Sequence, residues 1–318
     1  MSAVATLGVV VLNWNGGEAN LRCLRSLVHA GIPEERIVFV DNASDDGSRE
    51  AVERAFPRAL LVRNTANLGF CAGMNVGLRR ALERGDRTLL VLNNDVEVDT
   101  AFLAPLERAL AEERVGAAGP KVLLPGSQRR IWCAGGRIDH RANVSRLRGH
   151  GELDRGGYDR EEDVDYLPGC ALLLRAEALR EVGLFDEQFF AYMEDVDLGV
   201  RLRAQGWRVR YVPGSAVVHE SGSASGGGYA PARKYANALN SVRFLRKHSS
   251  LRGWLGLLVF DVLTLPLAFA REALRGGRPA AVLAKARGLL DGLRGRRVDA
   301  ASFARARAAR LRKEAARS

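Results

Sequence analysis

The chain has few cysteines, only four in 318 residues. Cys23, Cys71, Cys133 and Cys170 form no CxxC pair and no zinc-ligand spacing, which argues against a zinc site. We expect them to be small buried residues in a reducing compartment. The N-terminus also lacks a basic start followed by a long apolar region and a small-residue cleavage site. We therefore predict no signal peptide and a cytoplasmic catalytic part.

Clustered positive charge is missing from most of the chain. Residues 1–230 contain 28 Lys and Arg against 32 Asp and Glu, whereas residues 231–318 contain 20 against five. The net charge of +11 therefore belongs to the tail. A nucleic-acid-binding surface would need clustered Lys and Arg on the folded part, so we expect no nucleic acid partner. The basic tail favours an anionic surface, and a membrane is the predicted partner.

Long apolar runs are also scarce, with one exception at residues 251–270. This run approaches the roughly 20 residues that span a bilayer. Asp261 lies near its middle, where an Asp costs roughly 2.5–3.5 kcal/mol on insertion scales, and Pro266 interrupts it. We expect an interfacial or re-entrant helix, and a helix packed on the catalytic domain is the alternative. Residues 271–317 interleave apolar residues with Arg, which is typical of a basic amphipathic tail on a membrane.

What the first hundred residues do contain is a repeated pattern of short apolar segments that end in Asn or Asp. The segments are 7–12, 36–40, 59–63 and 89–92, and the polar residues after them include Asn13, Asn15, Asp41, Asn64, Asn67, Asn93, Asn94 and Asp95. Helical patterns fill the gaps at 21–28, 48–56 and 69–83. Strand–helix units of about thirty residues predict an α/β fold with a mostly parallel sheet flanked by helices. The polar strand ends then meet at one edge, where such sheets bind nucleotides.

Two loops at this edge allow more than one interpretation. The loop at 41–48 is dense in turn-forming residues, so local hydrogen bonding explains the loop as a whole, although for Asp41 itself we rank ligand contact first. Gly69, Gly73 and Gly77 are spaced four apart at a helix start. This spacing lets the backbone approach either a phosphate or another helix closely.

Four motifs resemble those of family 2 glycosyltransferases, most closely their bacterial rhamnosyltransferase-like branch. They are VVVLNWNGG (9–17), VDNASDDGS (40–48), NLGFCAGMNVGL (67–78) and LLVLNNDVEV (89–98), and the likeness continues through residues 169–209. The resemblance covers about the first 220 residues and implies a GT-A fold. It implies a catalytic domain at 1–230, in which about 1–118 bind the nucleotide and 119–230 face the acceptor. The composition of residues 231–318 predicts a helical, basic tail that associates with a membrane.

The resemblance also implies a donor site with a divalent Mg or Mn ion. Asn93, Asn94 and Asp95 align with the family's DxD metal motif, so Asp95 is expected to contact the cation on the donor diphosphate. Asn93 stands where many members have an acid, and its neutral amide is a weaker ligand for a hard cation. Asp41 is implied to contact the nucleobase. The backbone near Leu12, Asn13 and Asn15 is implied to line the base pocket, with Asn67 and Gly69 beside the ribose and diphosphate.

Acids at a predicted helix start form the second chemical centre. With 3.6 residues per turn, Glu194 and Asp197 share a face and Asp195 points about 100° away. Acids at this position also complement the helix dipole, which is the alternative explanation. The resemblance implies that Asp195 is the general base and that Glu194 and Asp197 lie on the acceptor side. His219 follows another predicted strand and is implied to lie near the donor diphosphate or on the metal. The Ser- and Gly-rich residues 221–228 suggest a linker or a lid.

Together these implications describe an inverting glycosyltransferase. It would move a sugar such as rhamnose from a dTDP- or UDP-sugar to a cell-envelope glycan or a lipid-linked precursor, at the inner face of the cell membrane. A sugar nucleotidyltransferase is an alternative, but residues 13–20 contain no Lys or Arg for a triphosphate loop. A membrane-bound interaction protein with an inactive transferase domain is another, although Asp41, Asp95 and Asp195 are all present. NWNGG in place of GxGxxG disfavours a NAD enzyme.

Overall fold

The computed structural model describes residues 6–141, 143–220, 230–248 and 251–301. Its contacts divide these residues into two compact units, each described separately below. The sheet unit comprises the described residues of 1–137, 147–186 and 195–221. The helical unit comprises those of 138–146, 187–194 and 222–318. Besides most of the predicted tail, the helical unit thus contains two short segments from earlier in the chain.

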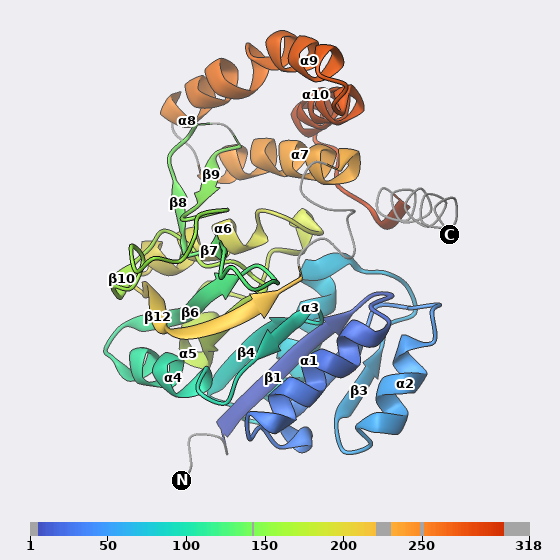
Figure 1. Cartoon of the computed structure of the whole chain (residues 1–318), viewed down its shortest axis with the longest axis vertical. Helices are drawn as coiled ribbons and strands as arrows, with labels where there is room; N and C mark the ends of the chain where they lie inside the picture. The colour runs from blue at the N-terminus through green and yellow to red at the C-terminus, as the bar shows by residue number, and fades with distance from the viewer. Residues whose placement is uncertain (1–5, 142, 221–229, 249–250, 302–318) are drawn as a thin grey trace. The chain divides into compact units, whose positions relative to one another are not determined.

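Among the described residues, ten strands of the sheet unit form one mixed sheet (Figure 1). Its strand order is β10-β12-β6-β11-β4-β1-β2-β3, with β5 beside β12 and β7 beside β6. A separate two-stranded sheet pairs β8 (Gly136–Ile138) with β9 (Ser145–Leu147). The strands of the mixed sheet are β1 Leu7–Asn13, β2 Ile37–Asp41, β3 Leu60–Arg63, β4 Thr88–Asn93, β5 Val96–Val98, β6 Val115–Leu123, β7 Ile131–Cys133, β10 Glu162–Asp163, β11 Ala171–Arg175 and β12 Arg208–His219.

The N-terminal half of the sheet is parallel, as the sequence predicts. Strands β3, β2, β1 and β4 are neighbours in that order, and Leu12 at the end of β1 lies opposite Val40 of β2 and Asn93 of β4. The other half is mixed, because β11 enters antiparallel between β4 and β6. This insertion puts Ala171, the first residue of β11, opposite Leu92 of β4. Residues just before β11 therefore lie at the carboxyl end of β4.

Helices cover both faces of this sheet. Val9 and Val11 of β1 belong to one core with Leu24 and Leu27 of α1, whereas Val10 lies against α3. Because successive strand residues point to opposite faces, α1 and α3 lie on opposite sides of the sheet. The helices of this layered arrangement are α1 Glu18–His29, α2 Ser48–Ala55, α3 Gly69–Glu83, α4 Leu103–Ala111, α5 Ala176–Val182 and α6 Glu194–Ala204, with a short 3-10 turn at Glu34–Arg36.

The glycines of α3 explain how closely it packs. A Cβ atom on Gly77 would clash with the side chain of Val10, and one on Gly73 would lie 2.8 Å from Leu12 Cδ1 and from Asn42 Nδ2. Gly69 differs, because it begins the helix with a φ of 82°, which favours glycine. The sequence suggested close approach to a phosphate or to another helix, whereas Gly73 and Gly77 bring α3 close to the strands of the sheet.

The helical unit consists mainly of α7 (Pro231–His248), α8 (Leu251–Gly256), a π-helical stretch (Leu257–Val262), α9 (Leu265–Leu274) and α10 (Pro279–Leu293). Helices α7 and α10 run parallel, since Gly288 lies against Tyr235 and Gly292 lies four residues further along α7, against Leu239. A Cβ atom on Gly292 would lie 2.9 Å from the Leu239 carbonyl oxygen. Residues 287–297 (RGLLDGLRGRR) belong to the stretch that the sequence suggested as a membrane-binding tail. In the structure this segment provides a helix-packing face.

One further contact ties an earlier segment into this unit. The Asn240 amide of α7 donates to the carbonyl oxygens of Phe189 at 2.7 Å, Ala191 at 2.9 Å and Tyr192 at 3.0 Å. Residues 187–194 include a single 3-10 turn, Glu187–Phe189. Within the described part of the chain, Leu251–Leu274 is the one helical stretch that is long and apolar enough to cross a membrane by length and composition.

Candidate active site

Asn13, the last residue of β1, is the centre of a buried hydrogen-bond network. Its Nδ2 donates to Asp41 Oδ1 at 3.0 Å, to Ser44 Oγ at 3.0 Å and to Ser48 Oγ at 2.9 Å. Its Oδ1 accepts from the Gly16 backbone N–H at 3.0 Å. The side chain is fully buried. Asn13 therefore joins the loops that follow β1 and β2.

The loop after β2 has the local hydrogen bonding that its turn-forming residues predicted. The other oxygen of Asp41, Oδ2, accepts from the Ser44 backbone N–H at 3.2 Å. Asn15, with a φ of 56°, accepts from the Asp45 backbone and donates its own N–H to Ser44 Oγ, both at 2.9 Å. Leu12 is half-buried beside them. Contact of Asp41 with a nucleobase stays a prediction.

Asn94, the middle residue of the predicted metal motif, is turned toward the same network. Its amide donates to Asn13 Oδ1 at 3.1 Å and to Asn20 Oδ1 at 2.9 Å. A Cβ atom on Gly16 would clash with this amide, so the close approach requires glycine there. Sequence reasoning missed Asn20, whose only signal is a polar residue among the apolar positions of α1.

Asp95, Asn93 and His219 meet where β4 ends. His219 Nε2 lies 3.1 Å from Asp95 Oδ1 and 3.5 Å from Asn93 Nδ2, and both His219 and Asp95 are buried. Strand pairing explains the meeting, because His219 lies opposite Val96 in the β12–β5 pair. The ring of Trp132 contacts the His219 ring edge to face, at 4.9 Å between centroids. The structure thus brings together two residues that the sequence placed 124 positions apart.

These residues fit a divalent cation as a two-ligand site. The described residues contain no cluster of three or more His, Cys, Asp and Glu that could hold a metal by itself. Asp95 Oδ1 and His219 Nε2 are 3.1 Å apart, close enough for one cation to contact both. A carboxylate and an imidazole suit Mn, and Mg commonly uses one or two carboxylates with substrate phosphates. Donor phosphates would have to complete such a site.

Asn67 and Gly69 form the turn that leads into α3. Asn67 Oδ1 accepts from the Gly69 backbone N–H at 2.9 Å and from Asn42 Nδ2 at 3.3 Å. Asn42 also donates to the Gly69 carbonyl oxygen at 2.9 Å. The turn is therefore fixed to the end of β2, beside Asp41.

Asp195, the second residue of α6, lies at the start of β11. Its Oδ1 accepts from its neighbour Val196 at 2.8 Å and its Oδ2 from the Gly169 backbone N–H at 3.3 Å. The carbonyl oxygen of the following residue, Cys170, accepts from the Asn93 N–H at 2.9 Å. The backbone of Gly169 and Cys170 thus contacts both the metal motif and Asp195.

Burial raises the pKa of Asp195 to about 6, and the backbone hydrogen bonds from Val196 and Gly169 act against this rise. Burial also raises the pKa of the Cys170 thiol well above its usual range, and Cys133, Asp95 and Asp195 add to the rise. Both carboxylates therefore lie within electrostatic reach of Cys170. All four cysteines are free and buried, as the sequence predicted.

The other two acids of α6 differ from Asp195. Asp197 is fully buried and pairs with Arg201 at 2.7 Å, and Arg201 also donates to the carbonyl oxygens of Val182 and Leu184. This arrangement favours a structural role, so the acceptor-side role of Asp197 stays a prediction. Glu194 is buried at the first position of α6 and belongs to the helical unit. The predicted linker or lid at 221–228 lies outside the described residues.

Known proteins are similar to this chain in sequence and in fold. The chain is 30% identical over 245 residues to the N-acetylglucosaminyl-diphospho-decaprenol L-rhamnosyltransferase of Mycobacterium tuberculosis, which covers 69% of this chain and 78% of the relative. It is 23% identical over 246 residues to the dTDP-rhamnosyl transferase RfbF of Shigella flexneri, covering 74% and 79%.

Among solved structures, the chain is similar to the mannosyltransferase PcManGT from Pyrobaculum calidifontis in complex with GDP-Man and Mn2+. The TM-score is 0.57 at 20% identity, over 90% of this chain and 80% of that chain. This likeness shows the GT-A fold. The sequence model described as "Glycosyltransferase like family 2" matches residues 5–232. With most of its length matched in this way and with rhamnosyltransferases among its relatives, the chain belongs to glycosyltransferase family 2 and is a glycosyltransferase.

Proposed function

We propose that this glycosyltransferase moves a deoxyhexose such as rhamnose from a dTDP- or UDP-sugar to a hydroxyl of a cell-envelope glycan or its lipid-linked precursor, with inversion. The observation that carries the proposal is the two-residue backbone segment of Gly169 and Cys170, whose N–H from Gly169 donates to Asp195 and whose carbonyl oxygen from Cys170 accepts from the Asn93 N–H. The names of the two rhamnosyl-transferring relatives support the sugar, and the decaprenol in one name supports a lipid-linked acceptor.

In the proposed mechanism Asp195 is the general base. An acceptor hydroxyl has too high a pKa to attack unaided, so the Asp195 carboxylate takes its proton as the oxygen bonds to the anomeric carbon. The bond from that carbon to the nucleotide diphosphate breaks in the same displacement, which inverts the configuration. A base with a pKa of about 6 is deprotonated at neutral pH yet more basic than an ordinary Asp.

Asp95 and His219 would hold the divalent cation, with Asn93 beside them. When bound, the cation would neutralise negative charge on the departing nucleotide diphosphate. The contact with Trp132 orients the His219 ring, and both His219 and Asp95 are buried.

The donor nucleotide would lie along the ends of β1 and β2. Asp41 and the backbone of Leu12, Asn13 and Asn15 would line the base pocket, with Asn67 and Gly69 beside the ribose and diphosphate. The side chain of Asn13 already has its partners, so we assign only its backbone to the donor. Asn94 would act indirectly, because its amide connects Asn13 to the metal motif.

We further propose that residues 1–230 are the catalytic domain and that residues 231–318 bring it to the inner face of the cell membrane. In the catalytic domain about 1–118 would serve the donor, and 119–230, with Glu194 and Asp197, the acceptor. The excess of Lys and Arg in 231–318 supports contact with anionic lipid.

The first experiment measures nucleotide release from dTDP-, UDP- and GDP-sugars with Mg, with Mn and with chelator, in the presence of bacterial membrane lipid extract. We expect metal-dependent release from a dTDP- or UDP-sugar. Release that is the same with chelator would contradict the metal proposal, and release only from a GDP-sugar would contradict the donor.

A second experiment tests the base. Asp195→Asn should lower kcat by about 10²–10⁴-fold, since this is the usual contribution of general base catalysis, while donor binding is retained. Asp99→Asn, which removes an exposed carboxylate, serves as the matched control. Turnover of Asp195→Asn at the rate of this control would reject the role.

A further inference from the structure

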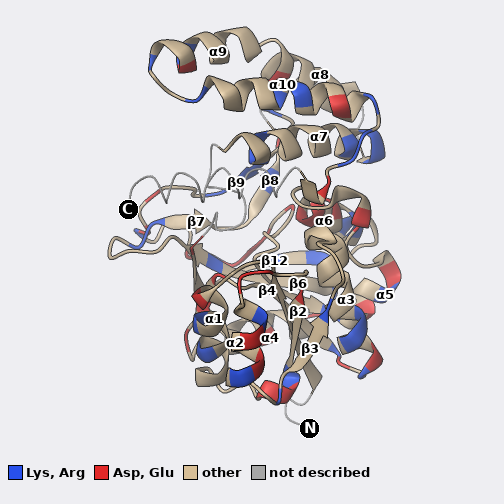
Figure 2. Ribbon diagram, turned by 90° about the vertical axis from the view of Figure 1, so that its right-hand side faces the viewer, with Lys and Arg blue, Asp and Glu red and all other residues tan. Residues whose placement is uncertain are grey.

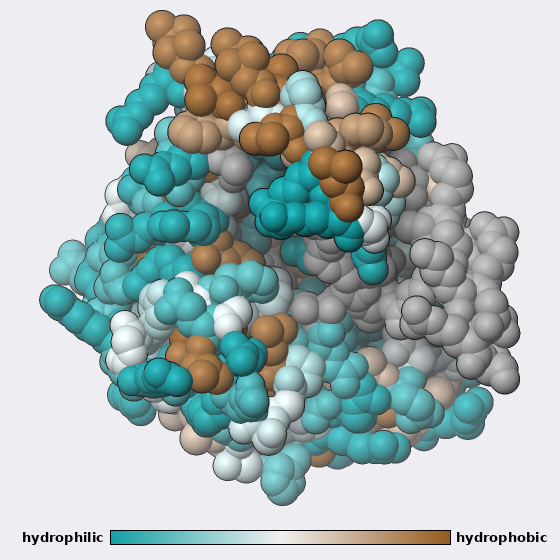
Figure 3. Space-filling model, turned by 45° about the horizontal axis from the view of Figure 1, so that its top comes forward, coloured by the Kyte–Doolittle hydropathy of each residue, from teal (hydrophilic) through white to brown (hydrophobic). Residues whose placement is uncertain are grey.

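The helix from Leu251 to Leu274 has its apolar side chains on the outside. A helix that packs on a protein core buries its apolar stripe and exposes its polar one. Here the buried positions of the first half are Gly253, Gly256, Leu257 and Asp261, of which only Leu257 is a large apolar residue. Figure 3 shows the resulting brown area over these helices, bordered by teal side chains. The exposed apolar residues are Leu251, Leu255, Leu258, Val259, Phe260, Val262, Leu263, Leu267, Phe269 and Leu274.

The inward side of this helix is held by polar contacts within the helical unit. Both carboxylate oxygens of Asp261 accept from the Asn143 backbone N–H at 3.1 Å, and Asp261 pairs with Lys285 of α10 at 2.6 Å. A Cβ atom on Gly256 would clash with the His140 carbonyl oxygen. The helix backbone therefore lies directly on the turn that contains His140 and Asn143. A helix that crossed a bilayer would have to break the Asp261–Lys285 pair or carry both charges into hydrocarbon. Either outcome is costly.

Positive charge lies at the edges of the apolar face. Arg252 is exposed near its start, and Arg271, Arg275 and Arg278 are exposed near its end. Figure 2 shows α9 as a mostly tan ribbon whose blue residues lie toward the turn into α10. A second copy of the chain docked on this face would bring these arginines against their own counterparts, whereas anionic lipid headgroups complement them.

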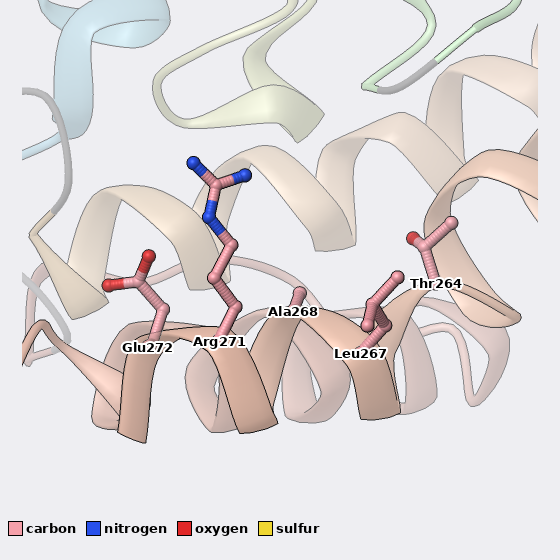
Figure 4. Close-up of a pocket in the computed structure, with 5 residues that line it drawn as sticks. All are labelled: Thr264, Leu267, Ala268, Arg271 and Glu272. Carbon is pink, nitrogen blue, oxygen red and sulfur yellow. The ribbon is translucent and has the colours of Figure 1, made fainter. Parts of the chain in front are cut away.

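One side of α9 carries both apolar and charged side chains. A pocket there is lined by Thr264, Leu267, Ala268, Arg271 and Glu272, whose side chains project from the same side of the helix (Figure 4). Arg271 places a cation next to the apolar Leu267 and Ala268. Glu272 accepts from the Arg278 backbone N–H at 2.9 Å and so helps to form the turn into α10.

We propose that residues 251–274 form an interfacial helix that lies in the plane of an anionic membrane and does not span it. Its apolar face would enter the region between headgroups and acyl chains, by roughly 5–10 Å. The proposal rests on the membrane location proposed above and specifies its surface and depth. Because Asp261 also binds Asn143, the helix holds a turn of the predicted acceptor half next to the lipid.

The first test uses vesicles and needs neither donor nor acceptor, so its outcome is independent of the sugar assignment. The double variant Leu263→Glu, Leu267→Glu changes two side chains that are 65% and 74% exposed. Its partition onto phosphatidylglycerol–phosphatidylcholine vesicles should fall on the order of a hundredfold, because two Leu side chains that would enter the lipid are replaced by charged ones. Leu60→Glu, at a position of β3 that is 44% exposed, is the matched control and should bind like the wild type.

Unchanged circular dichroism would show that the double variant folds. Equal vesicle binding by the double variant and the control would overturn the proposal. If the double variant instead loses self-association in sedimentation velocity while its vesicle binding is unchanged, the face is a contact between copies and the proposal is wrong.

The second test separates lying on the membrane from crossing it. Leu251→Cys and Leu274→Cys place a thiol at either end of the helix, at positions 75% and 87% exposed, while the four native cysteines are buried. Each variant is added to preformed sealed vesicles and treated from outside with a membrane-impermeant maleimide. We expect the two thiols to react alike, because an interfacial helix keeps both ends in the outer leaflet, and vesicles should slow both to the same extent. Reaction of one end and protection of the other would show a spanning helix and reject the proposal.

Discussion

At the scale of single residues, Asp195 makes the most direct prediction. Burial raises its pKa to about 6, and the proposed base works only as the carboxylate. The value of kcat/KM should therefore rise with pH up to about 6 and be level above it. A pH–rate profile of the wild type and of the Asp99→Asn control checks this. A profile that stays level down to pH 4 would contradict the assignment.

The same pKa predicts how stability depends on pH. In the folded protein the Asp195 pKa is about 6, whereas an unfolded chain has an Asp pKa of about 3.9. The folded state therefore binds the proton more tightly. The protonated Asp195 therefore adds to the free energy of unfolding. This stabilisation is fully present below about pH 3.9 and is lost as pH rises through about 6. Urea unfolding of the wild type and Asp195→Asn between pH 4 and 7 should show the difference in slope, and parallel curves would contradict it.

Asn13 is the residue on which the donor loops depend. Asn13→Ala should lower the free energy of unfolding by about 2–4 kcal/mol, because it leaves several buried groups without their hydrogen-bond partner. Asn237→Ala is the control, since this helix residue makes a single hydrogen bond to a backbone carbonyl. Urea titration measures both. A loss no larger than that of the control would show that the network is not cooperative.

Residue positions at strand ends could be predicted from the sequence, but their partners could not. A carboxylate after an apolar run indicates the sheet edge, and this reasoning led to Asp95. The Asn94 amide donates to Asn13 and Asn20 because the folded loops bring these side chains within hydrogen-bond distance. The local sequence does not show which of the several Asn side chains will be close to Asn94. Likewise, nothing in the local sequence separates Asp197, which pairs with Arg201, from Asp195.

At the scale of elements, helix α3 depends on its small residues. Gly77→Ala should destabilise the protein by about 1–3 kcal/mol, because the added methyl group clashes with Val10 in a packed core. Gly157→Ala is the control, since a Cβ atom there has open space, and it should change stability by less than about 1 kcal/mol. Thermal unfolding compares them. Equal melting temperatures would show that α3 can shift away from the sheet at little cost.

The predicted strands and helices of the first hundred residues are confirmed, because alternation of apolar runs and helical spacing is a local property. The antiparallel entry of β11 between β4 and β6 was not predicted, since strand pairing between distant segments leaves no local signal. In the tail, apolar residues interleaved with Arg suggested membrane contact throughout. In the structure Gly288 and Gly292 of that segment pack against α7, and membrane contact of the tail stays a prediction.

At the scale of the whole molecule, the division of charge predicts how salt affects membrane binding. Raising the salt from 0.1 M to 1 M shortens the Debye length from about 10 Å to about 3 Å. The preference for phosphatidylglycerol over phosphatidylcholine vesicles should then disappear, while binding through apolar contacts persists. Co-sedimentation with both vesicle types measures this. A preference that survives 1 M salt would show that lipid choice does not come from the basic residues.

The parallel packing of α7 and α10 gives the segment between them a second purpose. Two antiparallel helices can be joined by a short turn, but after the roughly 27 Å of an 18-residue helix the chain must travel back before a parallel partner can begin. Helices α8 and α9 are this return path. An equally long helix with polar outward positions, and with Asp261 kept, would complete the same path in water. Replacing the outward side chains alone should therefore yield a lipid-independent form of the enzyme.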